Sequence, residues 1–169
     1  MSGEAINDWR ERLRELIPLF GHRNWIVVAD SAYPAQSRPG IETIVADGSQ
    51  AEVVRHVFDA ITASGHVRGK VYVDSELVFV PEEDAPGVGA YRDELKAALK
   101  GAHLHTVPHE QVIARLDEAA EVFRVLILKT PMAIPYTSVF FELDCGYWSA
   151  DAEERMRERI AAAHAKGQS

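Results

Sequence analysis

Short apolar runs alternate along the chain with segments of helical periodicity, and this alternation limits the folds open to the sequence. The first run is WIVVA at residues 25–29, between a helical apolar stripe within residues 8–20 and a proline-containing loop at residues 31–41. A run of this length without polar alternation is typical of a strand buried on both faces of a sheet. The pattern therefore indicates a sheet that helices cover.

The same alternation continues towards the end of the chain. Further strands are predicted at residues 41–46, within 71–80, and at 103–107, 122–128 and 138–143. Further helices are predicted between Ser49 and Gly65, over residues 90–100, and after Pro108. Strands that alternate with helices favour one α/β domain, with a mixed or mostly parallel sheet and helices on both faces, a three-layer α/β/α arrangement. We expect this domain to comprise residues 1–144.

Residues 145–169 have a helical pattern of their own. Ser149 can cap a helix that runs to about residue 164, and a narrow apolar stripe follows from Ala152, Met156, Ile160 and Ala163. An isolated helix of this length is only marginally stable in water. We therefore expect a C-terminal helical extension that docks on the domain or on a neighbouring subunit.

Charge and cysteine content exclude several classes of function. The 169 residues include 18 Lys and Arg against 26 Asp and Glu, a formal net charge of −8. Such a chain is repelled by phosphate backbones and anionic lipids, so neither nucleic acid nor membrane is an expected partner. The lone cysteine, Cys145, excludes an intrachain disulfide. The N-terminal residues lack the pattern of a signal peptide, so we expect a cytoplasmic protein.

Two polar residues flank the first strand. His22 precedes the run at residues 25–29 and Asp30 follows it, where α/β folds commonly carry their ligands. Taken alone, His22 is more simply a turn residue and Asp30 a cap. A strand of seven or eight residues spans roughly 25 Å. The two side chains can therefore meet only if the chain curls back or if another subunit contributes one of them.

Three histidines, His103, His105 and His109, lie close together in the second half of the chain. They allow a metal site, but no carboxylate or cysteine stands at zinc spacing, so solvated or capping histidines are the simpler interpretation. We expect neither a metal nor another cofactor.

Other polar residues near strand ends allow a structural or a binding role. Tyr136, before the last predicted strand, could donate a phenolic hydrogen bond to a ligand or pack on the sheet edge. We expect Asp74 and Glu76 on the solvated surface.

The order of these segments resembles the ribose pyranase / fucose mutarotase family. Residues 19–24, LFGHRN, followed by an apolar strand that ends at Asp30, are similar to the first motif of the family. DSAYPAQS at residues 30–37 resembles the DAHFPAHS of the fucose branch. His109-Glu110-Gln111 is similar to the ribose branch, and Tyr136 aligns with the tyrosine of a YAN or YGN triplet. The likeness spans residues 8–143.

This resemblance implies an isomerase without a cofactor, which interconverts anomers or ring forms of a sugar such as L-fucose or D-ribose by acid–base ring opening. It implies that His22 transfers the proton. It also implies a set of sugar-binding residues, namely Asp30, His109, Tyr136, Thr137 and Ser138. The family likeness further implies a homo-oligomer, ring-like and often a decamer.

The departures from the family pattern keep a second function open. The triplet that begins at Tyr136 ends in Ser138 instead of asparagine, and Pro131-Met132 replaces a Gly-Glu pair. The alternative is a non-catalytic monosaccharide-binding or transport-associated protein on the same fold. A histidine-metal hydrolase is the third class.

Overall fold

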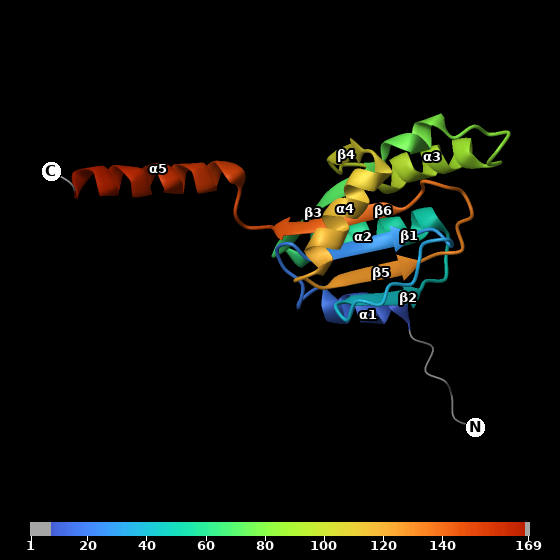
Figure 1. The fold of residues 1–169 in the computed structure, drawn as a ribbon, viewed down its shortest axis with the longest axis horizontal. Coiled ribbons are helices and arrows are strands. Elements are labelled where there is room, and N and C mark those ends of the chain that lie inside the picture. The colour runs from blue at the N-terminus through green and yellow to red at the C-terminus, as the bar shows by residue number, and fades with distance from the viewer. Residues whose placement is uncertain (1–7, 168–169) are drawn as a thin grey trace, which may run out of the picture.

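A six-stranded sheet forms the middle layer of the computed structural model, which describes residues 8–167 (Figure 1). The strands are β1 (Trp25–Ala29), β2 (Ile41–Val45), β3 (Val67–Asp74), β4 (Leu104–Val107), β5 (Val125–Lys129) and β6 (Val139–Cys145). Their order across the sheet is β2-β5-β1-β6-β3-β4. β6 runs antiparallel to both of its neighbours, whereas β2, β5 and β1 are mutually parallel, as are β3 and β4. The predicted mixed sheet is thus confirmed.

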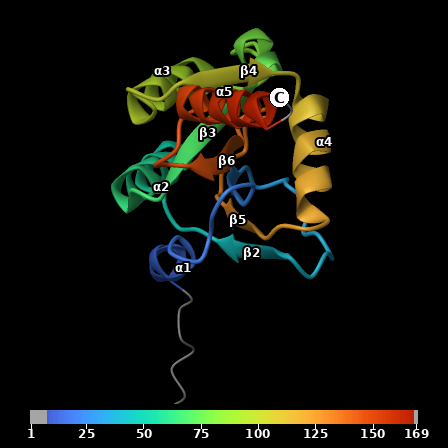
Figure 2. The ribbon, with the colours of Figure 1, turned by 90° about the vertical axis from the view of Figure 1, so that its left-hand side faces the viewer.

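Helices cover the two faces of this sheet unequally. The helices are α1 (Trp9–Leu16), α2 (Gln50–Ser64), α3 (Val88–Ala98), α4 (His109–Ala120) and α5 (Ala150–Lys166). The side chains of α1, α2 and α3 share a core with one face, and those of α4 share a second core with the other. Figure 2 shows the sheet between these layers, with α4 opposite α1 and α2. The predicted three-layer α/β/α architecture is therefore observed.

Local sequence explains why these elements begin where they do. Ser49 caps α2 by accepting from the backbone N–H of Glu52, and the Glu52 carboxylate accepts from the backbone N–H of Ser49 in return. Every residue of β1 is buried, because β1 pairs with β5 on one side and β6 on the other and is covered on both faces. The most continuous apolar run in the sequence therefore lies in the interior of the sheet.

Two predicted strands differ from the observed ones by three residues or more at one end, and the others, apart from β1, by one or two residues. The segment predicted within residues 71–80 is strand from Val67 to Asp74, and residues 75–79 form a short 3₁₀ helix, η1 (Ser75–Phe79). The reason is that β4 ends at Val107, which pairs with Asp74, so no partner strand extends beyond that point. The strand predicted from residue 122 begins at Val125, because the turn after α4 occupies the residues before it.

The C-terminal helix α5 extends away from the sheet (Figure 1). None of its residues is buried in the single chain. Ser149 caps it as predicted, by accepting from the backbone N–H of Ala152. Among the described residues, the domain of the same chain does not cover α5. Docking of α5 on a neighbouring subunit stays a prediction.

Candidate functional site

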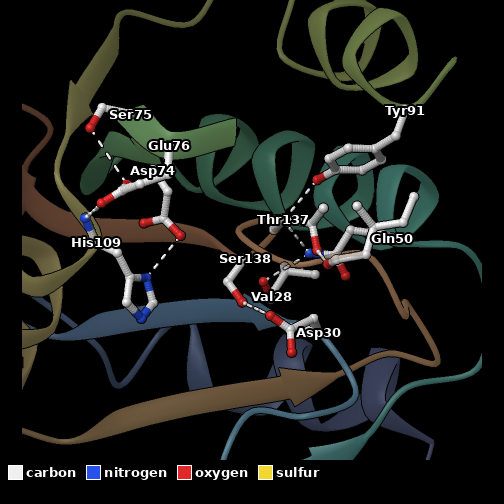
Figure 3. A network of polar contacts seen from close by, with 11 residues as sticks. Val28, Asp30, Gln50, Asp74, Ser75, Glu76, Tyr91, His109, Thr137 and Ser138 are labelled. Atoms are coloured by element: carbon white, nitrogen blue, oxygen red, sulfur yellow. Dashed lines mark hydrogen bonds and ion pairs between the residues drawn. The ribbon is translucent and has the colours of Figure 1, made fainter. Parts of the chain in front are cut away.

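Polar side chains from four strands meet at one edge of the sheet (Figure 3). Asp30 follows β1, Asp74 ends β3, and His109 begins α4 directly after β4. Ser138 precedes β6, and because β6 runs antiparallel, its beginning lies beside the carboxyl ends of its neighbours. We call this cluster of Asp30, Asp74, His109 and Ser138 the carboxyl edge.

Asp30 and Ser138 are joined by two hydrogen bonds. The Ser138 hydroxyl donates to Oδ2 of Asp30 at 3.1 Å and accepts from the Asp30 backbone N–H at 3.2 Å. Oδ1 of Asp30 accepts from the backbone N–H of Ala32 at 3.0 Å. Ser138 is buried and Asp30 only partly so. The serine therefore holds a carboxylate that solvent can still reach.

Thr137 supports the edge from the interior. Its carbonyl oxygen accepts from Nε2 of Gln50 at 2.9 Å and from the hydroxyl of Tyr91 at 2.8 Å. Burial raises the pKa of Tyr91, which keeps the phenol neutral and able to donate. The Thr137 hydroxyl donates to the carbonyl of Ile134, and the residue is buried. Thr137 thus binds its neighbours from the interior, and its sugar-binding role stays a prediction.

His109 is bound through both its side chain and its backbone. Its Nδ1 lies 2.8 Å from Oδ2 of Asp74, and its backbone N–H donates to the carboxylate of Glu76 at 3.0 and 3.1 Å. The side chain of Asp74 is 0% exposed. Burial raises the pKa of Asp74 to about 6, against the opposing effect of His109. These contacts fix the ring of His109 at the start of α4.

The expected solvation of Asp74 was wrong, and that of Glu76 was wrong in part. Asp74 ends a strand that lies between β6 and β4, and its carboxylate lies against the ring of His109, while Glu76 turns back onto the start of α4. A signal for Asp74 was present in the sequence. Like Asp30 after WIVVA, it ends an apolar run, VYV at residues 71–73.

Two tyrosines complete the surroundings of the carboxyl edge. Tyr136 has a backbone φ of 60°, and its ring lies 5.7 Å from that of His109, edge to face. It is 40% exposed, so a ligand can reach it. Tyr33 is buried, and its hydroxyl has no hydrogen-bond partner within residues 8–167. Burial raises its pKa, and the carboxylates of Asp117, Asp30 and Asp74 add to this effect. Tyr33 lies within the motif at residues 30–37, which gave it no predicted role at the site.

His22 lies at the opposite edge of the sheet. Its Nδ1 is 2.9 Å from Oδ1 of Asp144, near the end of β6, and its side chain is 57% exposed. Oδ2 of Asp144 accepts from Arg68 at 2.9 Å. Partial burial opposes ionisation of Asp144, but the hydrogen bonds from Arg68 and from the backbone of Cys145 lower its pKa overall. His22 and Asp30 do not meet in one chain, as the length of the strand between them predicts.

The histidines at residues 103 and 105 lie beside each other and beside an aromatic ring. Their rings are 4.8 Å apart, and His105 lies 5.1 Å from the ring of Tyr72. Within residues 8–167, no three His, Cys, Asp or Glu side chains are grouped so that they could hold a metal ion. The same part of the chain has no helix that is both long and apolar enough to span a membrane.

Solved structures with the same fold include sugar complexes. RbsD of Bacillus subtilis, complexed with D-ribose, is 14% identical, with a TM-score of 0.55 over 85% of this chain and 98% of that one. The fucose mutarotase of Streptococcus pneumoniae, in complex with L-fucose, is 16% identical, with a TM-score of 0.52 over 84% and 97%. At these identities the likeness establishes the fold.

Sequence comparison connects the chain to the same group of proteins. No protein of curated function matches it by sequence. The sequence profile of the RbsD / FucU transport protein family, however, matches residues 10–143, which include every strand but the last two residues of β6. The family resemblance seen in the motifs is thereby confirmed: the chain belongs to the RbsD / FucU transport protein family.

Proposed function

We propose that the protein is a mutarotase or pyranase, which interconverts the anomers or ring forms of a monosaccharide such as L-fucose or D-ribose. The observation that carries this proposal is the carboxyl edge, where a carboxylate, a hydroxyl and an imidazole lie beside the exposed Tyr136. A neutral polyol is recognised by hydrogen bonds and presents no charge to be neutralised, and these groups supply both donors and acceptors. Family membership supports the same chemistry.

Ring opening of a sugar is a transfer of two protons. The anomeric hydroxyl loses a proton, the bond between the anomeric carbon and the ring oxygen breaks, and the ring oxygen gains a proton. Closure on the other face of the carbonyl gives the other anomer, and closure through another hydroxyl gives the other ring size. Neither a redox cofactor nor a co-reactant is required, and histidine suits the task because it exchanges protons near neutral pH.

In this proposal His22 is a proton-transfer residue and Asp30 orients the sugar. Asp144 accepts from Nδ1 of His22, so Nε2 is the nitrogen available to the substrate. Asp30 accepts from sugar hydroxyls, and Tyr136 adds a phenolic donor. Because His22 and Asp30 lie at opposite ends of β1, we propose that His22 of a second copy completes the site at an interface of a closed homo-oligomer.

Saturation-transfer NMR on D-ribose and L-fucose tests the activity. The protein should accelerate exchange between anomers or ring forms of at least one sugar, and His22→Gln should slow this exchange by about 10²–10⁴-fold because a general acid–base group is lost. The matched control is His103→Gln, which alters an exposed histidine outside the site and should exchange at the unaltered rate. A folded His22→Gln protein with full activity would remove His22 from the mechanism.

A non-catalytic sugar-binding protein is the second candidate function. The observation in its favour is that the Ser138 hydroxyl is already used by Asp30 and that Thr137 is buried, so the triplet at residues 136–138 offers a ligand few free groups. The same NMR experiment separates the two functions. Binding of either sugar without accelerated exchange would favour the binding protein.

A further inference from the structure

We propose that His109, positioned by Asp74, is a second proton-transfer residue of the exchange reaction, with the acid and base roles divided between His109 and His22. This inference rests on the proposed function and assigns a further role within it. The family resemblance implies only that His109 binds the sugar. It assigns no role to Asp74.

The chemistry calls for two groups. Ring opening removes a proton at the anomeric hydroxyl and adds one at the ring oxygen, which are different atoms of the substrate. A single imidazole would have to deliver its proton at a second position within the lifetime of the intermediate. Two imidazoles, one protonated and one neutral, can act on the two oxygens together.

The structure marks His109 and His22 out among the histidines. All seven histidines of the chain fall within the described residues, and of these only His22 and His109 pair with a carboxylate. Each uses Nδ1, at 2.9 Å to Asp144 and 2.8 Å to Asp74. Neither Nε2 makes a hydrogen bond or an ion pair with another described residue. A carboxylate that accepts from Nδ1 orients the ring and leaves Nε2 to exchange protons.

The surroundings of Asp74 indicate more than a structural role. Its side chain is completely buried, and Oδ1 has no hydrogen-bond partner among the described residues. A buried carboxylate oxygen without a partner costs free energy, and such groups are concentrated at functional sites. Figure 3 shows Asp74 and His109 beside the Ser138–Asp30 pair, on the edge where the sugar is proposed to bind.

The position of His109 also suits contact with a ligand. Its side chain is 34% exposed, and the exposed ring of Tyr136 lies edge-on to it. Its backbone is held by Glu76, so both the ring and its anchor are fixed before a substrate arrives. A sugar bound against Tyr136 and Asp30 would therefore lie next to His109.

The proton balance of the step closes without a co-reactant. His22 takes the proton of the anomeric hydroxyl while the bond between the anomeric carbon and the ring oxygen breaks. His109 gives the proton on Nε2 to the ring oxygen. The open-chain aldehyde rotates about the bond next to the carbonyl carbon. On closure the attacking hydroxyl gives its proton to Nε2 of His109 and the carbonyl oxygen takes the proton from His22, so both histidines return to their starting states.

The test compares exchange with binding in two variants, using D-ribose and L-fucose as probes. His109→Gln should slow exchange by about 10²–10⁴-fold, as expected for loss of a general acid. Asp74→Asn should slow it by about 10-fold, because the amide oxygen still accepts from the His109 ring but the bond loses the negative charge that strengthened it. In both variants the dissociation constant of the sugar should rise less than the exchange rate falls. The control, Asp93→Asn, makes the same change on an exposed residue of α3.

Nitrogen-15 NMR of the His109 ring supplies a readout that does not depend on activity. In alkaline solution the unaltered protein should show the proton on Nδ1, and Asp74→Ala should show a mixture of the two tautomers. A mixture in the unaltered protein would overturn the positioning role of Asp74.

The activity measurements have three further outcomes. Exchange that survives His109→Gln overturns this inference and leaves the proposed function intact. Losses of binding and exchange that are equal in size mean that His109 only binds the sugar, which also overturns it. Absence of exchange in the unaltered protein overturns the proposed function and this inference together.

Discussion

The two aspartates that pair with histidines have opposite electrostatic surroundings. Asp144 lies near Arg68 and Lys70 and is partly exposed, so its pKa is lowered. Asp74 is fully enclosed, and its pKa is raised to about 6 by burial. The same residue type is thus a stable anion at one edge of the sheet and a titratable group at the other. This difference has a measurable effect on stability.

We predict that Asp74 lowers the stability of the protein as pH rises. A carboxyl group whose pKa is higher in the folded state favours folding while it is protonated in both states, below about pH 4. That contribution is lost as the pH rises through about 6. The difference from an ordinary aspartate corresponds to about 3 kcal/mol. Asp74→Asn keeps the shape and an acceptor for His109 but cannot ionise, so it should remove this dependence.

Urea denaturation between pH 4 and pH 8 measures this effect. The free energy of unfolding should fall with pH more steeply in the unaltered protein than in Asp74→Asn, and the variant should be the more stable protein at pH 8. Asp93→Asn serves as the exposed control and should follow the unaltered protein. Equal slopes in the unaltered protein and Asp74→Asn would show that another group titrates in this range.

Among the secondary-structure elements, β6 has a residue near each of its ends that holds a predicted site residue. Ser138, just before it, holds Asp30, and Asp144, close to its end, holds His22. It lies between β1 and β3 and is antiparallel to both. One strand therefore supplies a supporting residue to each edge. The helix that follows it, α5, supplies none to either.

We predict that α5 stabilises the protein or its oligomer and carries no catalytic residue. Deletion of residues 149–169 should lower the melting temperature or change the oligomer, and leave exchange per folded site largely intact, because the described part of the chain buries no residue of α5. Light scattering, thermal unfolding and the NMR exchange rate measure the three quantities. Loss of sugar binding with an unchanged oligomer and melting temperature would assign α5 to the site instead.

A pair of point variants tests the stripe without truncation. Ile160→Asp places a charge within the stripe, whereas Ala162→Asp places the same charge on the opposite side of the helix, and both positions are exposed in the single chain. Only Ile160→Asp should alter the assembly. Equal effects of the two variants would show that the stripe has no particular role.

For the whole molecule, the central feature is that its two histidine–aspartate pairs lie at opposite edges of one sheet. β1 separates His22 from Asp30, and among the described residues His22 is bound to Asp144 and Asp30 to Ser138. A site that needs both must therefore be assembled from two copies. Closed symmetry is the usual arrangement of soluble oligomers, and a ring gives every copy one neighbour at each edge.

We predict that two inactive variants complement each other. His22→Gln and Asp30→Asn should each be slow in exchange, but refolding an equal mixture should restore activity. In randomly mixed oligomers about a quarter of the sites combine an unaltered His22 from one copy with an unaltered Asp30 from its neighbour. The measurement is the exchange rate of the mixture against each variant refolded alone. A mixture no faster than the two variants alone would mean that each site is built within one chain.

Sequence alone was sufficient for what depends on near neighbours. Apolar runs predicted β1 and β2 to within a residue, and the caps Ser49 and Ser149 began α2 and α5 as expected. These signals are local, since periodicity and capping involve residues a few positions apart. The motif at residues 19–37 likewise carried the family assignment, which the sequence profile confirmed.

Tertiary structure decided which distant residues meet. The contact between Asp30 and Ser138 joins residues 108 positions apart, and that between His22 and Asp144 joins residues 122 positions apart. Both depend on β6 entering the sheet between β1 and β3 in the reverse direction, which no local pattern in the sequence specifies. The burial of Asp74 has the same origin: a polar residue near a strand end is solvated or enclosed according to which strands and helices pack around it, and that arrangement exists only in the folded chain.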